Sequence, residues 1–336
     1  MTADSIVTDE IRKYIGARVG AECHPEEVTN WAIKRYLEAT TDENPLWQDE
    51  EYARKSRWGG IIAPPTFVEV FSPSNYAFRQ CNEMMPSLNA LPFELPFPNL
   101  FEAFNEHEFF LPIRPGDFIQ PTCKIGDIYE KVGKGGVGRM VFVRRDNEYW
   151  NQNHELVAIT RWAVVFFEGT APTSAPATPP VSAPSTIEQP PLDTRQIYFD
   201  DVEIGSELPP LVKHISLVTI VKWAAALNDY GPHHFDYRFA TEEMGLRDVI
   251  AHGPLNCALL AQFMTNWIGG FGVLKKHYAE MRGNVFPGDT LVFHGKVVNK
   301  YLQDGEGFID CETWAENQEG SKVTPGRSTV TLPLKK

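Results

Sequence analysis

The pattern of hydrophobic positions predicts similar elements in both halves of the chain. Segments 28–39 and 215–227 carry apolar residues at three- and four-residue spacings, which indicates an amphipathic helix in each half. Segment 254–268 is apolar nearly all round, so a buried helix is expected there. Runs rich in β-branched and aromatic residues predict strands at 140–144, 156–167, 290–301, 307–315 and 328–334. We therefore expect an α+β fold, in which each half is a short helical segment, a long buried helix and an antiparallel sheet wrapped around it.

A segment rich in Pro, Ala, Ser and Thr divides the chain near its middle. Residues 169–191 offer almost nothing to bury and are predicted to be a semi-extended linker. A chain of 336 residues is also long for one hydrophobic core. We expect a first domain over 1–168, a linker over 169–192 and a second domain over 193–336.

Short motifs recur in the same order in both halves and indicate a duplication. Asp42 and Pro45 in the first half align with Asp229 and Pro232 in the second. An Ile-Ala pair and a Pro-Gly-Asp turn then follow in each half, ahead of the predicted strands. The order of these motifs argues for two copies of one unit more strongly than the number of identities does.

Only the second copy carries a full set of ionisable groups. Asp229 and His234 are five residues apart on a loop after a helix, where a carboxylate and an imidazole can converge on one water molecule. Gly253, preceded by His252, begins the apolar helix, whose first N–H groups lack helical partners and stabilise negative charge on a carbonyl oxygen. The alternative is that Asp229 caps a helix or turn and His234 is a surface loop residue.

The first copy keeps the scaffold positions but not the imidazoles. Trp47 occupies the position of His234, and Pro64 occupies that of His252. This difference is expected if one copy is catalytic and the other is not.

The second half resembles a MaoC-type, or hydratase 2, hot-dog domain. The signature of that family is a glycine followed by D-x-N-P-x-H, with H-G later at the start of the central helix. The matching residues here are Asp229, Pro232, His234, His252 and Gly253. The family's glycine and asparagine fall on Asn228 and Gly231. The first half, with D-x-N-P intact at 42–45, is similar to the degenerate dehydratase domain that often precedes such a domain.

The resemblance implies a double hot-dog fold and a hydro-lyase activity. Two antiparallel sheets, each around a central helix, would pack sheet to sheet as a pseudo-dimer within one chain, with the site at their interface. The implied reaction is the reversible hydration of a 2-enoyl-CoA to a 3-hydroxyacyl-CoA. No cofactor is implied apart from the coenzyme A that the substrate carries, and no metal.

The family analogy also assigns roles to residues. Asp229 and His234 would activate the water and deliver the α-proton, while the Gly253 N–H would hold the enolate oxygen. Asn228, Gly231 and His252 would support the site. The degenerate half would widen the acyl tunnel. Segment 92–110, dense in Phe and Pro, is expected to pack in the core and at a sheet edge, or to line that tunnel.

Two other functions fit the same residues. A non-catalytic acyl-CoA-binding or scaffold subunit is favoured by Gly231 and by the degenerate first half. A dehydratase acting on a carrier-protein thioester keeps the chemistry, but a net charge of −13 disfavours docking an acidic carrier. The sequence leaves the acyl group and the physiological direction open.

Composition restricts the expected partners and location. The acidic charge and the absence of a long Lys/Arg run argue against nucleic acid and membrane partners. Five scattered cysteines without a Cys-x-x-Cys pair fit a reducing compartment, and the polar N-terminus lacks a secretory apolar region. We expect a cytoplasmic protein that binds an acyl-CoA thioester and forms a homo-oligomer, with a dimer of pseudo-dimers as one form.

Overall fold

The computed structural model describes residues 5–20, 23–73, 91–97, 99–133, 137–169 and 188–335. Most of the predicted linker over 169–192 therefore lies outside the described residues. Among the described residues, no helix combines the length and the apolar character needed to cross a membrane.

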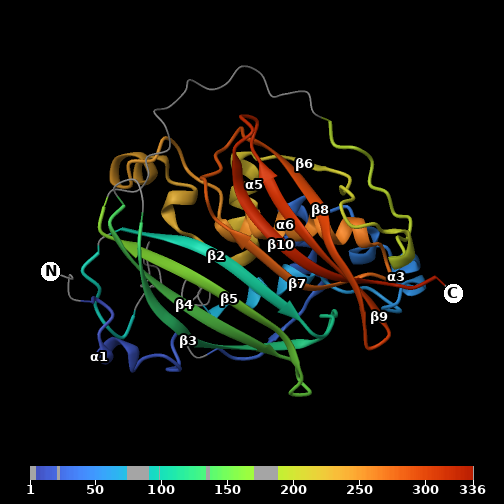
Figure 1. Cartoon of the computed structure of the whole chain (residues 1–336), viewed down its shortest axis with the longest axis horizontal. Helices are drawn as coiled ribbons and strands as arrows, with labels where there is room; N and C mark the ends of the chain where they lie inside the picture. The colour runs from blue at the N-terminus through green and yellow to red at the C-terminus, as the bar shows by residue number, and fades with distance from the viewer. Residues whose placement is uncertain are drawn as a thin grey trace.

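Within the described residues, the strands form one antiparallel sheet in the order β1-β3-β4-β5-β2-β7-β10-β9-β8-β6 (Figure 1). The first half contributes β1 (Glu26–Glu27), β2 (Asn99–Phe109), β3 (Phe118–Val132), β4 (Arg139–Trp150) and β5 (Leu156–Phe167). The second half contributes β6 (Leu211–His214), β7 (Val273–Glu280), β8 (Thr290–Gln303), β9 (Glu306–Glu316) and β10 (Lys322–Leu332). Each half therefore supplies one side of the sheet.

Helices and short helical turns connect these strands. The α-helices are α1 (Asp9–Arg12), α2 (Asn30–Thr40), α3 (Glu50–Lys55), α5 (Leu217–Leu227) and α6 (Gly253–Ile268). The shorter turns are η1 (Pro45–Trp47), η2 (Pro65–Phe71), η3 (Phe199–Asp201), η4 (Pro232–His234) and η5 (Phe239–Glu243). A long central helix was expected in the first half as well, but after η2 that segment lies mostly outside the described residues.

The two halves join edge to edge, through β2 and β7. These strands pair antiparallel, with Phe104 opposite Glu280 and His107 opposite His277. The expected α+β double hot-dog arrangement is present, but the expectation that two separate sheets pack against one another is wrong. The unpaired N–H and C=O groups of the two edge strands satisfy each other when the strands pair, which favours one continuous sheet.

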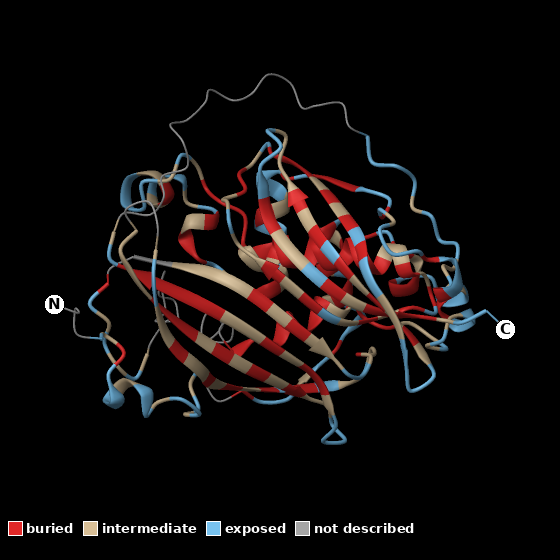
Figure 2. Ribbon diagram, viewed as in Figure 1, coloured by how far each residue is buried: buried red, intermediate tan, exposed pale blue. Residues whose placement is uncertain are grey.

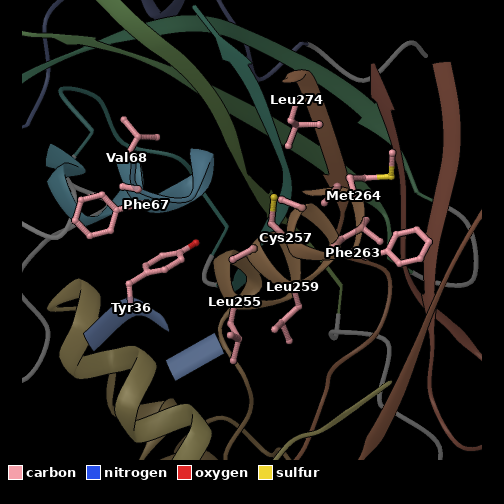
Figure 3. Close-up of a cluster of buried hydrophobic side chains, with 14 of the residues drawn as sticks. Tyr36, Phe67, Val68, Leu255, Cys257, Leu259, Phe263, Met264 and Leu274 are labelled. Atoms are coloured by element: carbon pink, nitrogen blue, oxygen red, sulfur yellow. The ribbon is translucent and has the colours of Figure 1, made fainter. Parts of the chain in front are cut away.

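The helix α6 lies in the hydrophobic core, as its apolar sequence predicts. Leu255, Leu259, Phe263 and Met264 are all at most 2% exposed and contribute to one large cluster (Figure 3). Burial of each such side chain stabilises the fold by roughly 1.5–3 kcal/mol. The helix carries Gly253 at its first position, so its packing also fixes one element of the candidate site.

The helices α2 and α5, predicted from both halves, pack against one another beside α6. The Tyr36 ring of α2 lies 5.3 Å from the Trp223 ring of α5, and its hydroxyl is 2.8 Å from Thr66 Oγ1. Both helices begin two residues later than the hydrophobic pattern predicts. Thr29 and Ser216 are their N-caps, and the side chain of each accepts a hydrogen bond from an N–H of the first turn.

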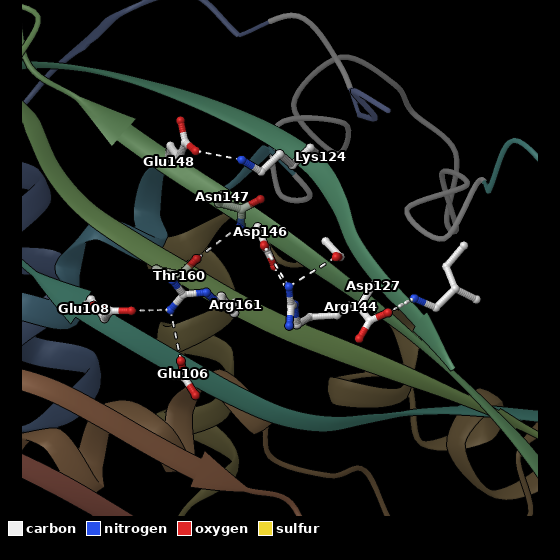
Figure 4. Close-up of polar contacts among 12 residues, drawn as sticks. Glu106, Glu108, Lys124, Asp127, Arg144, Asp146, Asn147, Glu148, Thr160 and Arg161 are labelled. Atoms are coloured by element: carbon white, nitrogen blue, oxygen red, sulfur yellow. Dashed lines mark hydrogen bonds and ion pairs between the residues drawn. The ribbon is translucent and has the colours of Figure 1, made fainter. Parts of the chain in front are cut away.

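Along the strands of the first half, buried residues alternate with half-buried ones (Figure 2). On β5, Arg161 Nη1 donates to Glu106 at 3.0 Å and to Glu108 at 2.6 Å, both on β2 (Figure 4). Lys124 of β3 donates to Glu148 of β4 at 2.9 Å. Such partly exposed pairs each contribute up to about 1 kcal/mol, so they fix strand register more than they add stability.

Lys213 links the second half to the first. From β6, its Nζ donates to Thr40 O, Thr41 O and Thr41 Oγ1, each at 2.9 Å. These groups lie at the C-terminal end of α2, where a cation is favoured by the helix dipole. Burial lowers the pKa of Lys213 to about 8, while Asp42 and Glu43 favour the charged form.

Replacing Lys213 should destabilise the protein. Lys213→Met leaves the carbonyls at the end of α2 without their donor, and we expect the free energy of unfolding to fall by about 2 kcal/mol. Exposed Lys222 of α5 provides the control, because Lys222→Met should change stability by at most about 0.5 kcal/mol. Urea unfolding followed by circular dichroism measures both. Equal effects of the two substitutions would refute the role given to Lys213.

Candidate active site

Asp229 and His234 follow the end of α5. The helix ends at Leu227, and its C-cap Asn228 has a left-handed backbone, with φ of 56°. This is the position of the family's glycine, and asparagine is one of the few other residues that adopts this conformation readily. Asn228 therefore meets the backbone requirement at this position.

The structure brings Asp229, His234 and His252 together. Side-chain ligand atoms of the three residues lie within 4.8 Å of one another. The His234 and His252 rings stack with centroids 3.4 Å apart. His234 is 6% exposed and His252 is fully buried, so the alternative of a surface loop histidine is wrong.

Hydrogen bonds with backbone carbonyls fix the tautomers of both imidazoles. His234 Nδ1 lies 2.7 Å from Ile250 O, and a carbonyl oxygen only accepts, so Nδ1 carries the proton. By the same argument His252 Nε2 donates to Asp229 O at 3.1 Å. His234 Nε2 then carries the lone pair that a general base requires.

Burial keeps both imidazoles neutral. It lowers the pKa of His234 well below its ordinary value, and the neighbouring rings of His252 and His233 act in the same direction. Burial also lowers the pKa of His252, from 6.5 to about 3. At neutral pH the site therefore contains an unprotonated histidine base.

His233 lies in the space next to Gly231, where the family has asparagine. A Cβ added to Gly231 would lie 2.9 Å from His233 Cε1 and 3.1 Å from His234 Cδ2. In the first half, Asn44 keeps the family amide, and its Oδ1 accepts from Leu46 N at 3.1 Å. In the second half the imidazole of His233, which the sequence pattern did not single out for this position, occupies that space instead.

Gly253 is covered by a residue of the first half. A Cβ added to Gly253 would lie 2.9 Å from Glu102 Cδ, and nearer still to Glu102 Oε2. Glu102 lies on β2, within the segment expected to pack in the core or line the tunnel. Sequence reasoning did not find Glu102, because its contact with Gly253 depends on the pairing of β2 with β7.

The corresponding position in the first half has no acid–base pair. Asp42 is buried there and accepts a hydrogen bond from Trp47 Nε1 at 3.1 Å. An apolar cavity adjoins Trp47 and is lined by residues of both halves, among them Ile62, Ile268 and Leu274. The α6 residues that line this cavity, Thr265 and Ile268, lie near the end of the helix, roughly 18–22 Å along its axis from Gly253. The cavity therefore belongs to the degenerate site, and a short acyl chain with its carbonyl at Gly253 would not reach it.

The cluster of Asp229, His234 and His252 also meets the distance criterion for a metal site. Each imidazole uses one nitrogen for a backbone carbonyl, so only its second nitrogen is available to a ligand. The stacked rings also direct their remaining nitrogens along nearly parallel planes, whereas tetrahedral ligands converge on one point. Asp236, another potential ligand, instead accepts hydrogen bonds from the backbone N–H groups of Arg238 and Phe239. The geometry suits acid–base chemistry better.

Solved structures with the same architecture define a class for this protein. A MaoC-like dehydratase superposes with a TM-score of 0.73, 22% identity, and coverage of 96% of this chain and 99% of the other. A Mycobacterium tuberculosis protein described as having a double hotdog fold superposes with a TM-score of 0.62 and 12% identity, and the match covers 95% of this chain and 96% of the other. The fold is therefore that of the double hot-dog proteins.

Sequence comparison then identifies the family. Residues 13–160 match the FAS1-like dehydratase domain region, and residues 203–315 match the MaoC like domain. The chain thus belongs to the MaoC-like family of hydratases and dehydratases. It is also 28% identical over 163 residues to a "Probable enoyl-CoA hydratase alpha subunit" of Thermomonospora curvata. That match covers 47% of this chain and about half, 50%, of the relative.

The buried neutral imidazole of His252 should make folding sensitive to acid. The unfolded chain takes up its proton below pH 6.5, whereas the folded chain does so only near pH 3. Between pH 7.5 and 5.0 this difference removes about 2 kcal/mol of stability. We expect His252→Gln to lack that contribution, since the amide does not titrate. The measurement is the free energy of unfolding of wild type and variant at both pH values.

Exposed His24 provides the control for this comparison. His24→Gln should leave the pH dependence of the free energy of unfolding as it is in wild type. The raised pKa of Glu102 changes the free energy of unfolding in the opposite direction over the same pH interval. The contribution of His252 is therefore obtained from the difference between wild type and His252→Gln. A pH dependence unchanged in His252→Gln would contradict a buried neutral His252.

Introducing the family's asparagine should disturb His233. The backbone of Gly231, with φ of −55°, accommodates any residue, so the obstacle is the neighbouring ring. We expect Gly231→Asn to cost about 1–3 kcal/mol of unfolding free energy from overpacking. In a His233→Ala background the same substitution should cost at least about 1 kcal/mol less. Additive effects in this double-mutant cycle would contradict the contact.

Proposed function

We propose that this protein is a hydro-lyase that reversibly hydrates a 2-enoyl-CoA to a 3-hydroxyacyl-CoA. The observation that carries the proposal is the state of His234. Its Nδ1–H is held by the Ile250 carbonyl, its ring is neutral, and one of its ring nitrogens lies within 4.8 Å of an Asp229 carboxylate oxygen in a buried site. Membership of the MaoC-like family and the name of the Thermomonospora curvata relative support the same reaction class.

The proposed step uses only residues of this chain and the substrate. The water oxygen bonds to the β-carbon as the carbon–carbon double bond breaks, and the electron pair moves onto the thioester as an enolate. Asp229 and His234 together take one proton from the water and return one proton to the α-carbon. The N–H of Gly253, at the first position of α6, stabilises the enolate oxygen with the help of the helix dipole. No cofactor takes part beyond the coenzyme A of the substrate.

The same chemistry also fits a carrier-protein thioester, and turnover of a coenzyme A ester in the test below would show that no carrier protein is required. We propose in addition that the chain assembles as an oligomer. The Thermomonospora curvata relative is named a subunit, which is consistent with assembly.

Crotonyl-CoA and bulkier enoyl-CoA esters provide the direct test. We expect wild type to hydrate at least one of them, and Asp229→Asn and His234→Ala each to lower kcat/KM by about 10²-fold or more, because each removes a proton-transfer group. Loss of absorbance of the conjugated thioester measures the rate. Turnover of none of these esters by wild type, or full activity in either variant, would sink the assignment.

Asp42→Asn is the matched control, because Asp42 is the counterpart of Asp229 in the degenerate half. The two Asp42 oxygens accept hydrogen bonds from Asn44 N and Trp47 Nε1 of the same half, so the substitution should affect local stability and not proton transfer at Asp229. We expect kcat/KM within about threefold of wild type. Calorimetry with the saturated ester butyryl-CoA completes the test. Tight binding without any turnover would instead favour the acyl-CoA-binding subunit.

A further inference from the structure

The side chain of Glu102 enters the second half's site from the first half. Within β2, the register shifts between Glu102 and Phe104, so that Ala103 is the extra residue of a β-bulge. The carbonyl of Ala103 accepts from Met281 N at 2.9 Å, just beyond β7. Bulges of this kind re-aim the neighbouring side chain. Here the bulge lies next to Glu102, whose carboxyl group lies over Gly253.

The Glu102 carboxyl lies directly against the first residue of α6. A Cβ at position 253 would lie 2.9 Å from Glu102 Cδ and 3.3 Å from Met281 Cγ, so the glycine leaves room for both side chains. Asn105 Nδ2 donates to Glu102 Oε1 at 2.6 Å. The second oxygen, Oε2, is the one closest to Gly253, where a thioester carbonyl is expected to bind.

The surroundings of Glu102 favour its neutral form. Burial raises the pKa of Glu102 to about 8, and the carboxylates of Glu69 in η2 and Asp229 after α5 act in the same direction. Asn105 is the partner that opposes this shift. A neutral carboxyl group has an O–H donor that a carboxylate lacks, and such acids stabilise oxyanions in apolar sites.

The degenerate site lacks a carboxyl group at the equivalent position. The spacing that relates Asp117 to Asp289 in the two Pro-Gly-Asp turns also relates Glu102 to Leu274. Leu274 lines the apolar cavity beside Trp47, as Glu102 lies beside Gly253. Three polar positions of the second site, those of Glu102, His234 and His252, are therefore apolar in the first, where they are Leu274, Trp47 and Pro64.

We propose that the carboxyl group of Glu102 donates a hydrogen bond to the thioester carbonyl of the substrate, beside the N–H of Gly253. This proposal rests on the proposed function. The proton stays on Glu102 while the carbonyl oxygen gains negative charge, so no bond to Glu102 is made or broken. An ionised Glu102 would instead lack the donor and repel the enolate. The first half thus supplies part of the oxyanion site of the second half.

Two substitutions of Glu102 separate the donor from the charge. Glu102→Gln keeps a donor and cannot ionise, while Glu102→Leu introduces the residue found at the equivalent position of the degenerate site. For crotonyl-CoA we expect kcat/KM of wild type to fall as pH rises through about 8. Glu102→Gln should lose this pH dependence and stay within about tenfold of wild type at pH 7. Glu102→Leu should lose about 10²-fold or more at pH 7.

The control is Glu106→Gln, on the same strand. Glu106 pairs with Arg161 on the polar face of the sheet, so its loss should leave both the rate and its pH dependence unchanged (Figure 4). Burial also lowers the pKa of Lys213 to about 8. A pH dependence that disappears in Glu102→Gln therefore belongs to Glu102 and not to Lys213. Thermal unfolding of each variant shows that it is folded.

A binding measurement tests the contact without turnover. Calorimetry compares butyryl-CoA with its thioether analogue S-butyl-CoA, which lacks the carbonyl. We expect wild type to prefer the thioester by about tenfold, or about 1.4 kcal/mol, and Glu102→Leu to show a clearly smaller preference, because only the Gly253 N–H then remains.

The two measurements distinguish failure of this proposal from failure of the proposed function. If wild type turns over enoyl-CoA but the Glu102 variants keep its rate, pH dependence and carbonyl preference, the Glu102 proposal is overturned and the hydratase function stands. If no ester is turned over but the carbonyl preference depends on Glu102, the contact stands and the hydratase function fails. A carbonyl preference that is independent of Glu102 overturns the proposal in either case.

Discussion

The pairing of β2 with β7 is the constraint on which the rest of the structure depends. It converts two half-sheets into one and places His107 opposite His277 at the junction, each 1% exposed. Because the two strands run antiparallel, each half extends its edge strand over the other half's helical layer. That geometry brings Glu102 to the first turn of α6, so the candidate site in the second half contains a residue of the first. A separate hot-dog unit would lack this contact.

The junction of β2 and β7 is buried but contains polar side chains. These side chains form hydrogen bonds with one another and with the backbone. His107 Nε2 lies 2.9 Å from Glu69 Oε1, while His277 Nε2 donates to the Cys257 carbonyl at 3.1 Å. His107 Nδ1 also lies 3.9 Å from Cys257 Sγ, an order of thiol, imidazole and carboxylate that resembles a nucleophilic triad. Burial raises the pKa of Cys257 well above its ordinary value and leaves the thiol 1% exposed, so this network holds the strands in register and does not present a nucleophile.

The sequence predicted what is local and periodic. The helices α2, α5 and α6, strand β5 to the residue, the duplication and the proximity of Asp229 to His234 follow from spacing and repetition, whereas α1 and α3 were not predicted. The sequence pattern did not predict contacts between segments distant along the chain. β2 was only a Phe- and Pro-dense segment, and the covering of Gly253 by Glu102 depends on which edges pair. The predicted starts of α2 and α5 are two residues too early. The N-cap hydrogen bond sets the start of each helix, and the hydrophobic period does not reveal it.

Each site contains residues from both halves. This gives a physical reason why the degenerate site differs from the candidate site at several positions together. The first half's site is completed by β7 of the second half, where Leu274 lies, and the second half's site is completed by β2. With Trp47 in the position of the imidazole, a carboxyl group at position 274 would be buried in an apolar cavity without a proton-transfer partner, at a cost of several kcal/mol. An apolar residue there removes that cost. The degenerate site therefore differs in residues of both halves, while the candidate site in the second half contains Glu102 from the first.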